Sequence, residues 1–198
     1  MEEEIIQRMK EGDKAAFDMF YEKYKNVAMH TVYLIVGNKA DSEDVVQESF
    51  IRCYEHISAL KHNEKFKGWF FHILTRTAWE YGKKKNKEVL QEDMSSFEKQ
   101  GVEPSAAEIT MAKERAASIM RLVEDLPLKH RTVVVLYYYN EFSTKEIAKI
   151  VGCLEGTVKS RLFTARRKLK EALLNSQNGK EEVYDEEIRF RQRDCKSV

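Results

Sequence analysis

Apolar residues recur at intervals of three and four along most of the chain, which is the spacing of α-helices that bury one face. One such stripe runs from Phe17 to Val36 and is interrupted at Gly37-Asn38. A second runs from Val46 to Ile57 on a helix that Asp41 is predicted to cap, and a third helix is predicted from about Gly68 to Lys85. With eight glycines and two prolines in 198 residues, little material is left for a turn-rich β protein. We expect an all-α fold.

The most regular pattern lies between Phe142 and Leu173. Ser143 and Glu146 have the spacing of a capping box, in which each residue bonds to the backbone of the other at the start of a helix. Gly152 supplies a left-handed stop, and a second helix is predicted to begin near Glu155. Two helices joined by a turn of about three residues are typical of a helix-turn-helix.

The second helix of this motif has one apolar and one polar face. At about 100° per residue, the apolar face is formed by Val158, Leu162, Ala165 and Leu169. The cations along the helix are Lys159, Arg161, Arg166, Arg167, Lys168 and Lys170. Such a helix can be merely solvated. The capping box, the glycine stop and the buried valine occur in register, however, and therefore favour a helix that enters a major groove of DNA.

The third predicted helix carries an unusual polar side. Trp79 lies there among cations, with His72, Arg76 and Lys83 on the same face. Aromatic rings interleaved with Arg and Lys are typical of platforms for single-stranded nucleic acid, where stacking contributes about 1 to 3 kcal/mol per base. Burial of the tryptophan under a partner domain is the commoner fate. Both interpretations stay open at the level of sequence.

The net charge of +1 is the sum of opposed segments. Residues 1–60 hold seven Lys and Arg against twelve Asp and Glu, and residues 61–91 hold eight against three. Residues 92–108 hold one against five, and residues 127–174 hold ten against four. This alternation suggests different partners for different segments.

No enzymatic chemistry is indicated. The sequence has no P-loop, no metal-ligand cluster and no nucleophile beside a base, so no catalytic residue, metal or cofactor is expected. Cys53, Cys153 and Cys195 are widely separated, which argues against a disulfide framework or zinc site. The acidic start is not a signal peptide, and no apolar run approaches the ~20 residues of a membrane span. We expect a cytoplasmic protein that does not insert into membranes.

Three segments in this order resemble the extracytoplasmic-function (ECF) sigma factors, the smallest members of the bacterial sigma-70 family, over roughly residues 10–174. The segment from Asp41 to Phe50, preceded by an aromatic helix, is similar to the region that docks on core RNA polymerase. The segment from Phe66 to Lys85 is similar to the helix that recognises the −10 element as a single strand. The segment from Glu146 to Leu169 resembles the reader of the −35 element.

The resemblance implies roles for individual positions. The core-polymerase-binding residues would be Asp44, Gln47 and Glu48. The −10 DNA-binding residues would be Trp69, His72, Arg76, Trp79 and Lys83. The −35 DNA-binding residues would be Lys159, Ser160, Arg161, Phe163, Thr164 and Arg166. Thr164 stands where the family often has Arg, so a bidentate donor is missing and the preference for guanine should be weaker.

The resemblance also implies an organisation and a set of partners. It predicts an N-terminal domain over residues 1–88, a linker over 89–107, a helix-turn-helix domain over 108–174 and a charged tail over 175–198, so that two small helical domains are joined by a flexible linker. The partners would be bacterial core RNA polymerase, promoter DNA in duplex and single-stranded form, and an anti-sigma factor. The protein would thus be an alternative sigma factor that selects promoters and assists DNA opening.

Two alternatives remain at this level. A conventional helix-turn-helix regulator would bind duplex DNA without polymerase, but it should carry a sensor or receiver domain of alternating strands and helices. A helical interaction protein would explain the acidic strip but not the helix-turn-helix.

Overall fold

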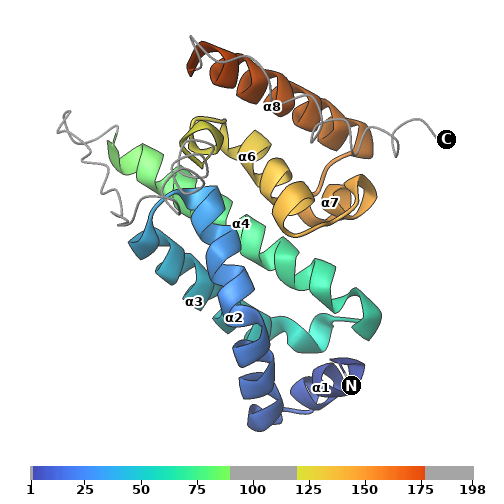
Figure 1. Cartoon of the computed structure of the whole chain (residues 1–198). Helices are drawn as coiled ribbons and strands as arrows, with labels where there is room; N and C mark the ends of the chain where they lie inside the picture. Colours follow the sequence, from blue (N-terminus) through green and yellow to red (C-terminus); the bar gives the residue numbers. More distant parts are fainter. Residues whose placement is uncertain (1, 90–119, 177–198) are drawn as a thin grey trace, which may run out of the picture.

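The computed structural model describes residues 2–89 and 120–176, which are helical and contain no strand (Figure 1). The N-terminal region comprises α1 (Glu2–Lys10), α2 (Lys14–Val36), α3 (Lys39–His56) and α4 (Phe66–Val89). The C-terminal region comprises α6 (Leu128–Val134), the π-helical turns Val135–Tyr139, α7 (Thr144–Val151) and α8 (Glu155–Ser176). The predicted all-α class is confirmed.

The break predicted at Gly37-Asn38 is found, but the residue that caps the next helix, α3, is not the predicted one. Gly37 ends α2 in the left-handed conformation, at φ 92°, where glycine is favoured. The next residue, Asn38, is therefore extended, and its side chain accepts a hydrogen bond of 2.9 Å from the backbone N–H of Asp41. Asn38, not Asp41, is the N-cap of α3, because the helix begins a turn earlier than predicted.

The helix predicted from Gly68 begins at Phe66, after two 3-10 turns over Ile57–Ala59 and Asn63–Lys65. Phe66 is buried, and its ring lies 5.0 Å from that of Phe20, edge to face. This aromatic contact holds the start of α4 against α2, which a prediction based on helical spacing alone does not capture.

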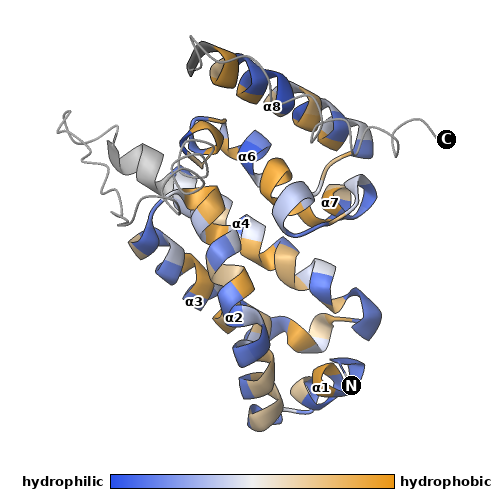
Figure 2. Cartoon of the chain, in the orientation of Figure 1, coloured by the Kyte–Doolittle hydropathy of each residue, from blue (hydrophilic) through white to orange (hydrophobic). Residues whose placement is uncertain are grey.

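Helix α4 lies at the centre of the molecule. It packs against α2 and α3 on one side and against α7 on the other, and apolar segments of α4, α6 and α7 face one another (Figure 2). One hydrophobic core is continuous from Ile6 in α1 to Ala165 in α8. The two helical regions are thus packed together through α4.

Some predicted features lie outside the described residues, namely the linker beyond residue 89, Cys195 and the tail from residue 177. Within the two described ranges, no group of three His, Cys, Asp or Glu side chains could hold a metal ion. None of the helices in these ranges combines the length and apolar character needed to cross a membrane.

Candidate polymerase and promoter interfaces

The helix-turn-helix forms as predicted. The backbone N–H of Ser143 donates to Glu146 Oε2 at 2.9 Å, and the N–H of Glu146 donates to Ser143 Oγ at 3.3 Å. Hydrogen bonds from the Ser143 hydroxyl and backbone lower the pKa of Glu146. Gly152 ends α7 with φ 66°, and α8 begins at Glu155. The capping box and the glycine stop predicted from the sequence are both confirmed.

The two faces of α8 are also those predicted. Val158, Leu162 and Ala165 are buried where α8 packs on α6 and α7. Lys159, Ser160 and Phe163 lie on the solvent side, and the Phe163 side chain is 68% exposed. The first turns of α8 therefore present a basic, aromatic and hydroxyl surface that no described part of the protein covers.

The charged groups at the start of α8 are paired with one another. Lys159 Nζ lies 3.1 Å from Glu155 Oε1, and Glu155 also accepts a hydrogen bond of 2.8 Å from Thr144 of α7. The Thr144 and Lys159 hydrogen bonds lower the pKa of Glu155. A carboxylate thus holds the lysine that is predicted to contact bases.

Two tyrosines from the C-terminal region hold Arg166. The Arg166 Nε donates to the Tyr138 hydroxyl at 2.7 Å, and the guanidinium lies 5.5 Å and 5.6 Å from the ring centroids of Tyr137 and Tyr138. Such stacking orients an arginine without neutralising it. Nothing in the sequence indicates that these tyrosines position Arg166, because they lie on a different element from α8. Of the other −35 candidates, Arg161 and Thr164 are half-buried.

The predicted docking residues line a groove between α3 and α4. Asp44 and Gln47 are exposed and Glu48 is half-buried. The remaining lining residues are Ile51, Arg52, Thr77, Glu80 and Tyr81. The Tyr81 hydroxyl donates to Asp44 Oδ2 at 2.9 Å, so the acidic strip is directly connected to the predicted −10 helix.

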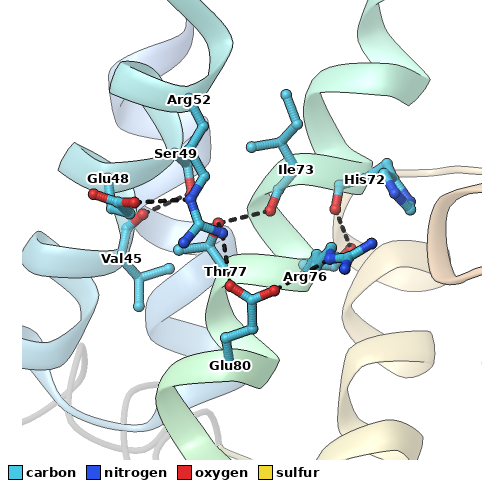
Figure 3. Close-up of polar contacts among 10 residues, drawn as sticks. Val45, Glu48, Ser49, Arg52, His72, Ile73, Arg76, Thr77 and Glu80 are labelled. Carbon is cyan, nitrogen blue, oxygen red and sulfur yellow. Dashed lines mark hydrogen bonds and ion pairs between the residues drawn. The ribbon is translucent and has the colours of Figure 1, made fainter. Parts of the chain in front are cut away.

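A chain of ion pairs makes a second connection between these helices (Figure 3). Arg52 bridges Glu48 on its own helix, at 2.8 Å, and Glu80 on α4, at 2.7 Å. Glu80 also pairs with Arg76 at 3.1 Å. Hydrogen bonds from Arg52, and then from Arg76, lower the pKa of Glu80. The pairs of Glu48 with Arg52 and of Arg76 with Glu80 follow from their spacing of four residues in the sequence. The pair of Arg52 with Glu80, which joins the two helices, cannot be predicted from spacing.

The predicted −10 residues do not share one open face. Arg76 and Lys83 are exposed, and Trp69 is half-buried beside Phe66. His72 and Trp79 instead meet the C-terminal region: Trp79 Nε1 donates to Thr132 Oγ1 at 2.9 Å, and His72 Nδ1 lies 2.6 Å from the carbonyl oxygen of Ile150. Of the two interpretations of Trp79, a partner region covering it is the one found in this arrangement.

Comparisons with known proteins agree with this organisation. Residues 20–88 match the family model of sigma-70 region 2, and residues 116–169 match that of sigma-70 region 4. The ECF RNA polymerase sigma factor SigW of Bacillus subtilis is 34% identical over 178 residues, covering 85% of this chain and 94% of that protein. The RNA polymerase sigma-H factor of Pseudomonas aeruginosa is 29% identical over 182 residues, covering 87% and 93%.

Solved structures share the fold. CnrH in complex with the cytosolic domain of CnrY aligns with a TM-score of 0.64 at 19% identity, covering 89% of this chain and 99% of that one. The sigma factor RpoE in complex with the anti-sigma factor NepR from Bartonella quintana aligns with a TM-score of 0.66 at 22% identity, covering 80% and 96%. Because region 2 accounts for the N-terminal half, a conventional duplex-binding regulator is not favoured. The chain belongs to the ECF sigma factors of the sigma-70 family, and it acts as an alternative sigma factor that binds core RNA polymerase and recognises promoter DNA in transcription initiation.

Proposed function

We propose that this sigma factor binds its partners through three surfaces. The groove between α3 and α4 docks on core polymerase, α4 binds the −10 strand, and the first turns of α8 bind the −35 duplex. The observation that carries the proposal is the open face of α8, where Lys159, Ser160 and Phe163 lie side by side above a buried Val158. The protein performs no catalysis itself and acts in the cytoplasm, where polymerase and promoters are found.

The mechanism of opening follows from differential binding. Stacked duplex DNA is exchanged for unstacked bases held by the protein, and each base stacked on an aromatic ring offsets the cost by about 1 to 3 kcal/mol. Trp79 and Trp69 are the rings on α4 that would receive such bases, with Arg76 and Lys83 near the backbone phosphates. No nucleotide hydrolysis is needed in this scheme.

The −35 assignment is tested by Lys159→Ala. Transcription is measured with core polymerase on a library of promoter fragments, and Lys170→Ala is the matched control, because Lys170 is an exposed lysine further along the same helix. Loss of one base contact should weaken binding by about 1 to 3 kcal/mol at particular −35 sequences. The control should weaken binding equally at all −35 sequences. If Lys159→Ala also weakens binding equally at all of them, this lysine contacts phosphates and not bases.

The docking assignment is tested by Glu48→Gln. We expect core-polymerase affinity to fall about tenfold, the effect of losing about 1.4 kcal/mol, because the negative charge of a proposed docking residue is lost while its shape is kept. Glu43→Gln is the matched control, since Glu43 lies on the same helix, is exposed, and belongs to no predicted site. Equal losses in the two variants would show a general effect of charge and would contradict a specific docking groove.

An anti-sigma factor is the further partner that we propose. It is supported by the similar solved structure of the sigma factor RpoE, which is in complex with the anti-sigma factor NepR, and by that of CnrH, which is in complex with the cytosolic domain of CnrY. If a small membrane protein is encoded beside this sigma factor, it is the first candidate to test by co-purification, and failure of its cytosolic part to reduce transcription would exclude that candidate.

A further inference from the structure

Glu155 is an acidic residue at the start of a helix whose other charges are mostly positive. Helix α8 contains two acidic residues, Glu155 and Glu171, against six Lys and Arg. An acid in the first turn of a helix commonly stabilises the helix dipole. In a recognition helix, however, the first turns enter the major groove, where a carboxylate repels phosphates. Glu155 therefore opposes binding to DNA in general, and it can favour binding only at particular bases.

Two neighbouring side chains fix the Glu155 carboxylate. Its Oε1 atom accepts a hydrogen bond of 2.8 Å from the Thr144 hydroxyl and lies 3.1 Å from Lys159 Nζ. These hydrogen bonds lower the pKa of Glu155, so the carboxylate is ionised at neutral pH. The Glu155 side chain is 40% exposed. Within the described part of the chain both contacts use Oε1, which leaves Oε2 to accept a hydrogen bond from a ligand.

Bases differ in the hydrogen-bonding groups that they place in the major groove. Cytosine N4 and adenine N6 are amino donors, whereas guanine O6 and thymine O4 are acceptors. An ionised carboxylate can only accept a hydrogen bond, and an ammonium can only donate one. We propose that Glu155 is a specificity-determining residue of the −35 surface, and that it selects a base with an amino group, cytosine or adenine. The identity of the ligand, the −35 duplex, rests on the proposed function.

The pair of Glu155 and Lys159 matches the edge of a single base pair. In every Watson–Crick pair, the amino group of one base is hydrogen-bonded to the keto oxygen of the other, so a donor and an acceptor lie side by side in the major groove. Glu155 and Lys159 present an acceptor and a donor 3.1 Å apart. With the amino base beneath Glu155, Lys159 reaches the keto oxygen of the partner base. With the base pair reversed, the carboxylate faces an acceptor and the ammonium faces a donor.

Thr144 is a positioning residue in this scheme. It belongs to α7, which packs on α8, and its hydroxyl ties the Glu155 carboxylate to the neighbouring helix. Lys159 is less available to phosphates while it is paired with Glu155. Lys168 and Lys170, further along α8, are exposed and can neutralise phosphates at any sequence. The start of α8 therefore selects bases, and its later turns add affinity.

The test measures binding of the holoenzyme with Glu155→Gln to promoter fragments randomised through the −35 element. The amide keeps the shape but can donate as well as accept. Discrimination between the two orientations of one −35 base pair should therefore fall about tenfold. The slope of log K against log salt should become steeper by about one, because Lys159 is freed to bind a phosphate. Glu171→Gln is the matched control and should keep the parent's base preference, since Glu171 is exposed and pairs with Arg167 on the same helix.

The variant Thr144→Val separates the position of the carboxylate from its charge. It removes the hydroxyl that fixes Oε1 and leaves Glu155 ionised. Discrimination at the same base pair should fall about threefold, the effect of losing one hydrogen bond, while the salt dependence stays that of the parent. A merely structural role of Thr144 would lower the melting temperature without changing base preference. If circular dichroism shows that Glu155→Gln is unfolded, Thr144→Val decides by the same library readout.

The outcomes separate this inference from the proposed function. If Lys159→Ala changes the −35 base preference and Glu155→Gln does not, the role of Glu155 is overturned and the −35 assignment to α8 stands. If Glu155→Gln raises affinity equally at all sequences, Glu155 only repels phosphates, and its selective role is overturned as well. If neither Lys159→Ala nor Glu155→Gln changes the preference, the proposed −35 function of α8 itself fails.

Discussion

Helices α4 and α8 carry the same kind of sequence signature but differ in how far the fold exposes it. Each has an aromatic residue among cations on its polar side, Trp79 on α4 and Phe163 on α8. Phe163 is 68% exposed, whereas Trp79 is half-buried and hydrogen-bonded to Thr132. An aromatic residue among cations therefore indicates what a helix can bind, but the packing of neighbouring helices decides whether the surface is open. The predictions below test this contrast.

The largest difference is expected between two phenylalanines. Phe71→Ala should lower the free energy of unfolding by about 3 to 5 kcal/mol, because a fully buried ring between the two regions is replaced by a cavity. Phe163→Ala should change it by less than about 0.5 kcal/mol, since the ring is mainly in water. Urea denaturation followed by circular dichroism measures both. Similar values for the two variants would contradict the contrast between the helices.

A smaller effect is expected at the start of the helix-turn-helix. Ser143→Ala should cost about 1 kcal/mol of stability, the usual value for the loss of an N-cap side chain. The same capping box should respond to pH. Because hydrogen bonds from Ser143 lower the pKa of Glu146 in the folded state below its ordinary value of about 4.3, the ionised carboxylate stabilises the fold above that pH, and this contribution is lost as the pH falls through the lower folded pKa.

The pH dependence is checked by comparing the unfolding free energies of wild type and Glu146→Ala at neutral pH and at progressively lower pH. The difference should shrink on acidification below about 4.3, the ordinary pKa of Glu. A difference that grows on acidification would contradict the assigned sign. A matched control is Glu55→Ala, because Glu55 is an exposed glutamate on α3 and lies outside the capping box.

The smallest effect is expected in the network between the docking groove and α4. Arg52→Gln should change the unfolding free energy by no more than about 1 kcal/mol, because its ion pairs are partly exposed and therefore screened by solvent and salt. Arg167→Gln, which removes a pair with Glu171 on α8 alone, is the control. If Arg52 couples docking to strand binding, its substitution should weaken −10 binding by the holoenzyme while the control does not. Equal effects would show that the network is only structural.

Local features were the ones that the sequence predicted well. The Ser143–Glu146 capping box, the Gly152 stop and the buried Val158 depend on residues within a few positions of one another, and all three were found. The prediction that Asp41 caps α3 was wrong although it also depends on nearby residues, because Asn38, one turn earlier, is the N-cap. Short-range hydrogen bonds and helical periodicity therefore explain most of what could be read in advance.

Contacts between distant residues could not be read in this way. Three such contacts join different helices: the ion pair of Arg52 with Glu80, the hydrogen bond from the Tyr81 hydroxyl to Asp44, and the hydrogen bond from Arg166 to the Tyr138 hydroxyl. Their members carry ordinary surface side chains, and no spacing in the sequence relates them. The sequence did not predict these contacts, because they depend on how the helices are placed relative to one another and not on the preferences of single segments.

The sequence by itself determined that the chain is helical, that Phe142 to Leu173 form a helix-turn-helix, and that acidic and basic segments alternate. These properties follow from periodicity, capping and charge, which act over one or two helical turns. Only the tertiary structure decided that α4 is enclosed on both sides and that His72 and Trp79 face the C-terminal region. That decision depends on how well distant apolar surfaces fit together, and such complementarity arises only once the helices have packed.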